Sequence, residues 1–390
     1  MTKMLFLTPR NPYNEISGGT IGTIHSLEFL KKHFYIDLYC FNQGNNKSME
    51  KTDKLSELNS FTYIDFATKK RDFKTILCSL FNRLPLSIYR NYSLEMKKTI
   101  ANVINNYELV YVDHWLMMQF IPSNYTGTVI LREHNAEYIM WKRRLSIEKN
   151  FLKKFYLKLE LIKIKKYEKY ICNKANYVLT FTENDKQALI EIGVNSEHIS
   201  VLPALIISTE YNHKKNYDLL ENNILYVGTM NWDANVDGLK YFLANIYPKL
   251  KEKVNDIKFY IVGKNPPTDI QKFAENDKSI ILTGFVPDLK EYYDKCKLFV
   301  VYLRYGSGVK IKILEALANN IPVVSNEIGL EGIHTNAAIL ANSDDEFVNI
   351  IAKTIKNNET LKSLSKEALR YVNKTFSERN YEIYFEKHCK

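Results

Sequence analysis

The residues best suited to chemistry lie in residues 305–318, where a glycine-rich turn leads from a predicted strand into a predicted helix. The turn and the first helical turn contain two glycines, a serine and two lysines: Gly306, Ser307, Gly308, Lys310 and Lys312. Backbone N–H groups at a helix N-terminus bind phosphate oxygens, and lysine adds positive charge there. Because a lysine at this end opposes the helix macrodipole, its placement favours an anion nearby. The pattern therefore predicts a phosphate-binding turn.

Glu315 lies three residues after Lys312, on the same face of the predicted helix. One interpretation is a solvated ion pair between the two side chains. The other is a carboxylate that accepts hydrogen bonds from the hydroxyl groups of a ribose. The spacing alone does not separate these two roles.

Further glycines lie at the ends of predicted strands. Gly228, Gly263 and Gly284 each end a strand in the second half of the chain, and Gly18 and Gly19 follow the first strand. A glycine at the carboxyl end of a parallel strand lets the next turn approach a ligand closely, and open α/β sheets bind nucleotides at this edge. For Gly18 and Gly19 alone, an ordinary β-to-α turn is the simpler interpretation.

Strands that alternate with amphipathic helices are expected to position these residues. The predicted strands cover residues 4–8, 34–41, 61–66, 109–113, 129–133 and 177–182, then 224–228, 257–263, 280–284, 298–302 and 322–325. This alternation predicts an α/β protein with a doubly wound parallel sheet in each half. We expect an N-terminal Rossmann-like domain at residues 1–207 and a polar linker at 208–223. A C-terminal Rossmann-like, nucleotide-binding domain at 224–375 and a helix at 376–390 that packs back on the first domain should follow.

Two such domains should face each other across a cleft, with the carboxyl ends of their strands lining it. His134 follows the strand at residues 128–133 and is either a structural residue or a group that hydrogen-bonds a ligand in the cleft. Asp113 and His114 end another strand at the same edge and are secondary candidates for contact with a substrate in the cleft. Glu133 and Glu137 are weaker candidates on either side of His134.

The motifs together resemble a known family. Residues 306–325 and 329–332 closely resemble the nucleotide-sugar motif of the retaining glycosyltransferases with the GT-B fold, family GT4. Residues 227–237 and 284–288 look like two other landmarks of that family's C-terminal domain. Residues 14–20 and 132–138 resemble its N-terminal glycine loop and central loop. Several landmarks in the family's order are more specific than any one glycine motif.

The resemblance implies roles for individual residues. Glu315 would bind the ribose, and Lys310 and Lys312 would meet the diphosphate of a nucleotide sugar. Gly18 and Gly19 would approach the same diphosphate from the other domain. The base would lie between backbone groups of residues that follow the strand at 280–284: Gly284, Phe285 and Val286. His134, Lys310 and Glu315 are the residues expected to support the transfer itself, and Gly228 and the turn at 306–308 complete the donor site.

The chain departs from the family pattern at two places. The family usually has two glutamates eight positions apart, but here Ser307 stands at the first position. After Gly228 there is no clear arginine and lysine pair of the kind that many members use on the diphosphate. The resemblance further implies that the enzyme needs no metal or cofactor, and no spacing of histidines indicates a metal site.

The positive charge of the chain is concentrated in one segment. The net charge is +10, and residues 142–170 contain eleven basic and three acidic side chains. The segment is either a basic amphipathic helix on an anionic membrane or a core-packed helix with a solvated cationic face. Nucleic-acid binding is not expected, because no recognised nucleic-acid module accompanies the charge.

The remaining composition indicates a folded cytoplasmic protein. The 390 residues are enough for two or three domains, and the five cysteines are scattered without a Cys-x-x-Cys pair. The N-terminal apolar run is too short for a signal peptide, and no segment is expected to span a membrane.

The expected function is retaining transfer of a sugar from a nucleoside-diphosphate sugar to a glycan or lipid-linked acceptor, in bacterial surface polysaccharide assembly. The enzyme would be cytoplasmic or peripheral on the inner face of the cell membrane. A sugar-nucleotide epimerase with the same fold, and a catalytically silent partner subunit of a glycosyltransferase complex, are the alternatives.

Overall fold

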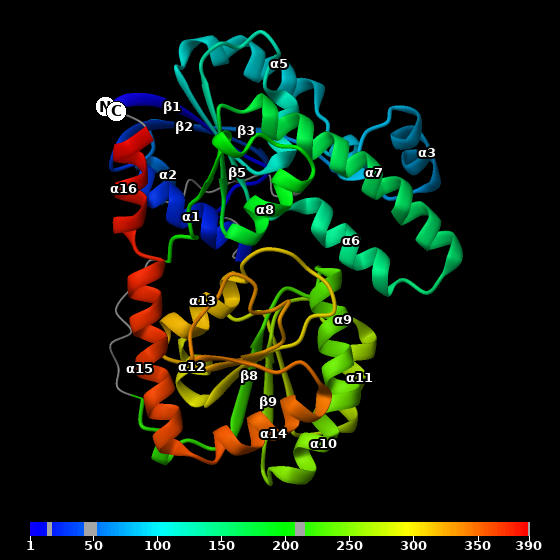
Figure 1. The fold of residues 1–390 in the computed structure, drawn as a ribbon, viewed down its shortest axis with the longest axis vertical. Helices are drawn as coiled ribbons and strands as arrows, with labels where there is room; N and C mark the ends of the chain where they lie inside the picture. Colours follow the sequence, from blue (N-terminus) through cyan, green and yellow to red (C-terminus); the bar gives the residue numbers. More distant parts are fainter. Residues whose placement is uncertain (14–17, 43–52, 207–214, 389–390) are drawn as a thin grey trace. The chain divides into compact units, whose positions relative to one another are not determined.

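The computed structural model describes residues 1–13, 18–42, 53–206 and 215–388. They form two compact units, Met1–Pro203 and Ala204–Lys390, and each unit is considered by itself (Figure 1). Residues 208–214 of the predicted linker lie outside the described residues, and the rest of it contains the short helix η4 (Tyr217–Leu219). The packing of residues 376–390 on the first domain stays a prediction.

Within its described residues, the first unit contains a seven-stranded parallel sheet in the order β3-β2-β1-β4-β5-β6-β7. The strands are β1 (Thr2–Thr8), β2 (Phe34–Asn42), β3 (Ser60–Asp65), β4 (Leu109–Asp113), β5 (Thr128–Glu133), β6 (Tyr177–Thr180) and β7 (Ile199–Val201). The strand order reverses between β1 and β4, and open α/β sheets bind ligands at such a point. The α-helices of this unit are α1 (Gly18–Leu30), α2 (Asp53–Ser56), α3 (Phe73–Phe81), α4 (Leu86–Arg90), α5 (Leu94–Val103), α6 (Glu137–Ile147), α7 (Phe151–Lys174) and α8 (Glu183–Glu191).

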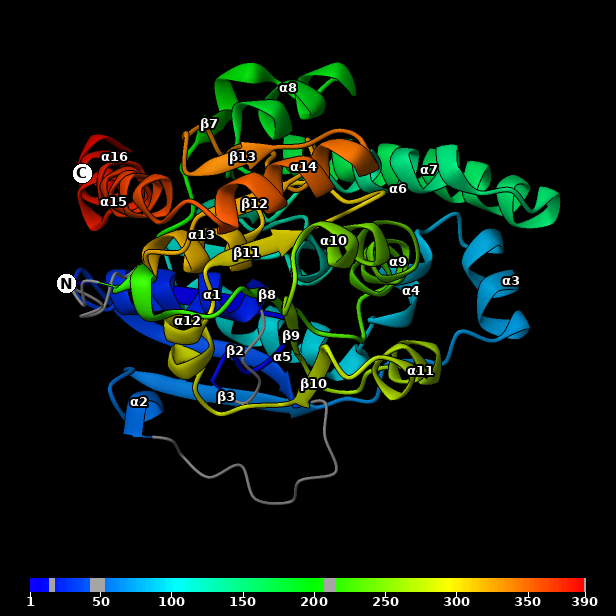
Figure 2. The ribbon, with the colours of Figure 1, turned by 90° about the horizontal axis from the view of Figure 1, so that it is seen from below.

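The described part of the second unit contains a six-stranded parallel sheet in the order β10-β9-β8-β11-β12-β13. Its strands are β8 (Asn223–Val227), β9 (Lys258–Val262), β10 (Ile280–Gly284), β11 (Leu298–Val301), β12 (Val323–Ser325) and β13 (Ala338–Leu340). Its α-helices are α9 (Asp233–Tyr241), α10 (Tyr247–Lys253), α11 (Thr268–Asn276), α12 (Lys290–Lys295), α13 (Ile311–Ala318), α14 (Asp344–Ile355), α15 (Asn358–Thr375) and α16 (Glu378–His388). Helices cover both faces of the sheet, as seen from below in Figure 2.

The predicted fold class of two doubly wound parallel sheets is confirmed. Every predicted strand is present, with bounds that agree within two residues. The strands β7 and β13 were not predicted, because three residues at the rim of a sheet are too few for a periodic pattern. The central strands are buried on both faces, which explains why they appear in the sequence as continuous apolar runs rather than as alternating ones.

Gly238 lets helix α9 pack directly on the loop after β11. A β-carbon at this position would lie 2.0 Å from the carbonyl oxygen of Tyr302. The neighbouring atom belongs to the backbone, so the contact cannot be relieved by rotating a side chain. The packing of α9 therefore requires glycine here.

We expect Gly238→Ala to destabilise the protein by about 1–3 kcal/mol, the usual cost of overpacking. Alanine favours a helix over glycine by roughly 0.5–1 kcal/mol, so a loss of stability would report the clash and not the helix propensity. Urea unfolding followed by circular dichroism measures the change. The control is Glu275→Ala on the exposed face of α11, where a change within about 0.5 kcal/mol is expected. A Gly238→Ala protein as stable as this control would contradict the packing argument.

Candidate active site

The glycine-rich turn lies at the carboxyl edge of the second sheet, between β11 and α13. Gly306 and Gly308 have φ angles of 151° and 69°, which side chains rarely adopt. Lys310 caps the helix and Ile311 is its first residue. The turn predicted from the sequence is therefore present, and its backbone path depends on the two glycines.

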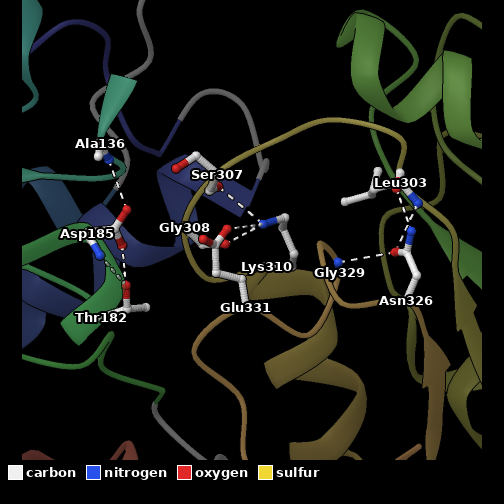
Figure 3. A network of polar contacts seen from close by, with 10 residues as sticks. All are labelled: Ala136, Thr182, Asp185, Leu303, Ser307, Gly308, Lys310, Asn326, Gly329 and Glu331. Carbon is white, nitrogen blue, oxygen red and sulfur yellow. Dashed lines mark hydrogen bonds and ion pairs between the residues drawn. The ribbon is translucent and has the colours of Figure 1, made fainter. Parts of the chain in front are cut away.

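Lys310 bends back into this turn (Figure 3). Its ammonium donates hydrogen bonds to the carbonyl oxygens of Ser307, at 3.2 Å, and Gly308. The same Nζ lies 3.8 Å from Oε2 of Glu331, and the two side chains are only 11% and 7% exposed. The turn thus contains a buried cation held by backbone oxygens and one carboxylate.

Lys312 is the second residue of α13, and its side chain reaches α9 and β8. Its ammonium donates to Oδ1 of Asn235 at 2.7 Å and to the hydroxyl of Tyr226 at 3.2 Å. It also lies 4.6 Å from the centre of the Tyr226 ring. Burial, and then the charge of Lys310, lower the pKa of Lys312 to about 7. Across the described residues no carboxylate forms an ion pair with Lys312, so an anionic ligand would stabilise its charged form.

Glu315 is half-buried on α13, and burial raises the pKa of its carboxyl to about 7. No residue in the described ranges donates a hydrogen bond to this carboxylate or pairs with it. The ion pair with Lys312 that the spacing allowed is not formed, because the Lys312 ammonium binds Asn235 instead. A half-buried carboxylate in this situation is suited to accept hydrogen bonds from a ligand.

The glycines that end the strands bring three turns together. The N–H of Gly228 donates to the carbonyl of Val262 at 3.0 Å, and the N–H of Gly263 donates to the carbonyl of Gly284 at 3.0 Å. Gly284 has a φ of 71°, and a β-carbon there would meet no atom within 4 Å. The next residue, Phe285, is 61% exposed. The backbone predicted to hold a base is thus open on the side of Gly284.

The loops after β11 and β12 are joined by one side chain. Oδ1 of Asn326 accepts hydrogen bonds from the N–H groups of Leu303 and Gly329, both at 3.3 Å, and its Nδ2 donates to the carbonyl of Leu303 at 2.6 Å (Figure 3). This contact fixes the loop that carries Glu331 relative to the glycine-rich turn.

In the first unit, His134 lies against a buried aspartate at the carboxyl edge of the sheet. Its Nε2 lies 3.2 Å from Oδ1 of Asp113, and the hydroxyl of Thr23 donates to Oδ2 of Asp113 at 2.5 Å. The guanidinium of Arg132 lies 3.4 Å from the same carboxylate. Burial by itself would raise the pKa of Asp113, but the charges of Arg132 and His134 outweigh it and hold the pKa well below its usual value. Asp113 is therefore a fixed negative charge beneath the imidazole.

His114 occupies an unusual backbone conformation beside this pair. Its φ is 137°, a value that favours glycine, and its ring centre lies 5.2 Å from that of His134. Burial, and then the charge of His134, lower the pKa of His114 to about 3. His114 is thus a neutral imidazole at physiological pH, and its Nδ1 accepts the N–H of Leu116 at 3.2 Å.

Two buried carboxylates hold the loop that follows His134. Oδ1 of Asp185 accepts the N–H of Ala136 at 2.9 Å (Figure 3). The two oxygens of Glu168 accept the N–H groups of Glu137 at 2.6 Å and Tyr138 at 3.1 Å. These are the free amides at the start of α6, and carboxylates stabilise such a helix end. The loop that follows His134 is therefore held in place by hydrogen bonds to Asp185 and Glu168.

Glu133 and Glu137 turn out to be buried, with exposed fractions of 1% and 9%. Burial raises the pKa of Glu137 to about 7, and burial together with the carboxylate of Glu168 raises that of Glu133 well above its usual value. Glu133 accepts the thiol of Cys172 at 3.7 Å. The carboxyl groups of Glu133 and Glu137 are thus buried in the first unit.

The remaining predicted residues are placed as follows. Helix α1 begins at Gly18, so Gly18 and Gly19 form its first turn, while residues 14–17 of the predicted glycine loop lie outside the described residues. The described residues contain no group of three or more His, Cys, Asp or Glu side chains that could hold a metal ion. The need for no metal or cofactor stays a prediction.

Sequence reasoning missed several groups that contact the predicted ones, namely Thr23, Tyr226, Asn235 and Glu331. Asn235 and Tyr226 lie 77 and 86 positions from Lys312 in the chain. Asn235 falls inside the landmark at 227–237, which is the one signal that could have pointed to it.

Comparison with solved structures identifies the fold. HepE of Anabaena, solved with UDP and glucose, is 14% identical, with all of both chains covered and a TM-score of 0.70. TarM of S. aureus is 13% identical over 99% of both chains with a TM-score of 0.72. Sucrose-phosphate synthase of Thermosynechococcus elongatus is 15% identical, covers 99% of this chain and 98% of its own, and has a TM-score of 0.70. The fold is that of the GT-B glycosyltransferases.

A family model matches part of the chain. Residues 221–357 match the family described as glycosyl transferases group 1, in agreement with the motifs of the second half. A curated relative of Klebsiella pneumoniae, described as an uncharacterized 44.6 kDa protein in cps region, is 24% identical over 97% of both chains.

The raised pKa of Glu315 predicts a pH-dependent stability. Its folded value of about 7 exceeds the ordinary value of 4.5, so the folded chain keeps a proton that the unfolded chain releases. The associated stability is fully present below about pH 4.5 and is lost as the pH rises through about 7. Glu315→Gln cannot titrate, so we expect its urea midpoint to fall less between about pH 5 and pH 8 than that of the wild type. Glu275→Gln, on an exposed site, should follow the wild type; identical profiles for Glu315→Gln and wild type would refute the assignment.

Proposed function

We propose that this protein is a retaining glycosyltransferase that moves a sugar from a nucleoside-diphosphate sugar to a glycan or lipid-linked acceptor. The observation that carries the proposal is the arrangement on α13. A glycine-rich turn, two lysines of which one lacks an acidic partner among the described residues, and the uncompensated carboxylate of Glu315 follow one another at a sheet edge. This is the set of groups that a diphosphate and a ribose require.

In the proposed reaction, the bond between the anomeric carbon and the diphosphate oxygen breaks, and its electron pair leaves with the nucleoside diphosphate. The acceptor oxygen forms the new bond on the same face of the sugar, and its proton passes to the departing phosphate oxygen. Lys310, Lys312 and the amides of the turn stabilise the negative charge that develops on the leaving group. His134, oriented by Asp113, hydrogen-bonds the transferred sugar.

The relatives support a role for the reaction in the cell. The Klebsiella protein is described as lying in a cps region, and HepE and TarM were solved with UDP. These descriptions support a role in surface polysaccharide assembly and a uridine nucleotide as the first donor to test. The resemblance to GT-B enzymes that retain configuration supports the stereochemical part of the proposal. The proposed location of the enzyme is the cytoplasm, where sugar nucleotides are available.

The proposal is tested with a panel of sugar nucleotides in EDTA, with release of nucleoside diphosphate and sugar transfer as the readouts. We expect turnover by the wild type with at least one donor. Glu315→Ala should lose UDP affinity by roughly tenfold or more, since a hydrogen-bonded carboxylate contributes about 1.5–3 kcal/mol. His134→Ala should keep UDP affinity within about twofold yet lose turnover by roughly 100-fold, the lower range for a positioned polar group at the reacting sugar.

Each outcome has a definite meaning for the proposal. Unchanged UDP affinity in Glu315→Ala would overturn the ribose role. Absence of turnover with every donor, combined with UDP binding by the wild type, would favour a catalytically silent subunit. Conversion of one sugar nucleotide into another would favour an epimerase.

The lowered pKa of Lys312 gives a second test. A bound diphosphate favours the protonated lysine, so binding above pH 7 must take up a proton, and UDP affinity should fall as the pH rises from about 7 to 9. In Lys312→Arg the side chain stays charged throughout, and in Lys312→Met it carries no charge, so the pH slope should be smaller in both. Isothermal titration calorimetry measures the slope, with Lys272→Met on the exposed face of α11 as the control. A slope in Lys312→Met equal to that of wild type would exclude the diphosphate contact.

A further inference from the structure

Helix α3 shows its apolar face to solvent. Phe73, Leu77 and Phe81 recur every four residues, which places them on one face, and they are 79%, 41% and 79% exposed. A helix of a globular protein normally turns such a stripe toward the core. The exposed stripe therefore indicates a partner.

The N-terminal turns of α7 are exposed in the same way. Phe151, Leu152 and Phe155 are 79%, 75% and 59% exposed. Farther along the helix, Ile164 and Ile171 are buried in the core of the first unit. The prediction of a single helix at residues 142–170 is wrong, because this segment covers the end of α6, a break at residues 148–150 and most of α7. Helix α7 has a core-packed C-terminal part and an exposed apolar N-terminal part.

Helices α3 and α7 lie on the same side of the first unit (Figures 1 and 2). At one point the ammonium of Lys163 donates to the hydroxyl of Ser79 at 3.1 Å. This hydrogen bond joins the C-terminal part of α3 to the middle of α7. The six exposed apolar residues of these two helices are together called the α3–α7 surface below: Phe73, Leu77, Phe81, Phe151, Leu152 and Phe155.

Cationic side chains surround this surface. Six exposed basic residues lie among the apolar ones: Lys70, Arg71, Lys74, Lys153, Lys154 and Lys158. Three acidic residues lie nearby in the sequence, and one of them, Glu148, accepts the N–H of Asn150 at 2.9 Å. Asp72 caps α3 by accepting the N–H of Thr75 at 2.8 Å, and Glu160 is fully buried, where it accepts the N–H of Leu86 and pairs with Lys163 at 2.6 Å. The α3–α7 surface is thus both apolar and positive.

We infer that the α3–α7 surface docks the protein on an anionic lipid bilayer. The two helices would lie in the interface, with the phenylalanines among the acyl chains and the lysines at the lipid phosphates. Charge complementarity selects this occupant, because exposed aromatic side chains interleaved with lysines match an apolar layer edged by negative headgroups. None of the helices in the described ranges is long and apolar enough to cross a membrane, so the contact is peripheral. The inference does not depend on the proposed transfer activity.

The experiment is flotation of the full chain with vesicles of phosphatidylcholine containing roughly 30% phosphatidylglycerol, against vesicles of pure phosphatidylcholine. We expect binding to the anionic vesicles and a marked fall at about 500 mM salt, because the attraction is screened. Each lysine near the membrane contributes about 1 kcal/mol, so Lys153→Gln/Lys154→Gln/Lys158→Gln should reduce the partition coefficient by roughly 100-fold. Phe81→Ser/Phe151→Ser should reduce it by roughly tenfold or more, since each ring removes apolar area from water.

Matched controls lie on the second unit. Lys272→Gln/Lys353→Gln/Lys374→Gln removes the same charge from exposed positions, and Leu219→Ser removes an 82% exposed apolar side chain. Both should bind vesicles like the wild type. The circular dichroism spectrum and the urea midpoint should stay close to those of the wild type in all four variants, which shows that they are folded. Absence of wild-type binding to anionic vesicles, or equal binding by the α3–α7 variants and the controls, would overturn the inference. Self-association that Phe81→Ser/Phe151→Ser abolishes, without vesicle binding, would assign the surface to a second copy instead.

Discussion

The first unit depends on two glutamates that helix α7 buries. Glu160 accepts the first amide of α4, and Glu168 accepts the first two amides of α6. A helix N-terminus left without acceptors inside a protein costs free energy, and a carboxylate satisfies the amides while opposing the positive end of the macrodipole. One helix therefore sets the direction of two others. Through Glu168 it supports the loop of His134, and through Glu160 it anchors the segment that follows α3.

The same burial decides what α7 presents to solvent. Its buried stripe runs through Leu157, Glu160, Ile164 and Glu168, so two of the three acidic residues of the basic segment face inward. The outward side is left with lysines and, at the N-terminal end, with phenylalanines. A structural requirement of the core thus produces the cationic apolar surface that we assign to the membrane. The core interpretation holds for the C-terminal part of α7, whereas membrane docking is proposed only for its exposed N-terminal part.

The second unit places its charges by a different device. Parallel strands deliver their turns to one edge, and positive φ angles at Gly306 and Gly308 fold the turn after β11 around the ammonium of Lys310. Lys312 is held by neutral groups and Glu315 by none in the described chain, and burial moves the pKa of each toward neutrality. Groups that a protein leaves uncompensated in this way are suited to a ligand of opposite charge or with hydroxyl groups. The electrostatics of α13 thus agree with the family match of residues 221–357.

The sequence by itself determined the strands, the parallel sheets, the glycine-rich turn and the residues of α13, because these features depend on neighbours within about ten positions along the chain. It also showed where the charge lies. The sequence could not decide whether Glu315 pairs with Lys312. It also could not show that Asn235 binds Lys312 or that Asp113 orients His134. Nor could it separate the buried part of α7 from the exposed part. Those outcomes depend on contacts between residues tens of positions apart, which exist only after the sheet order and the helix packing bring them together.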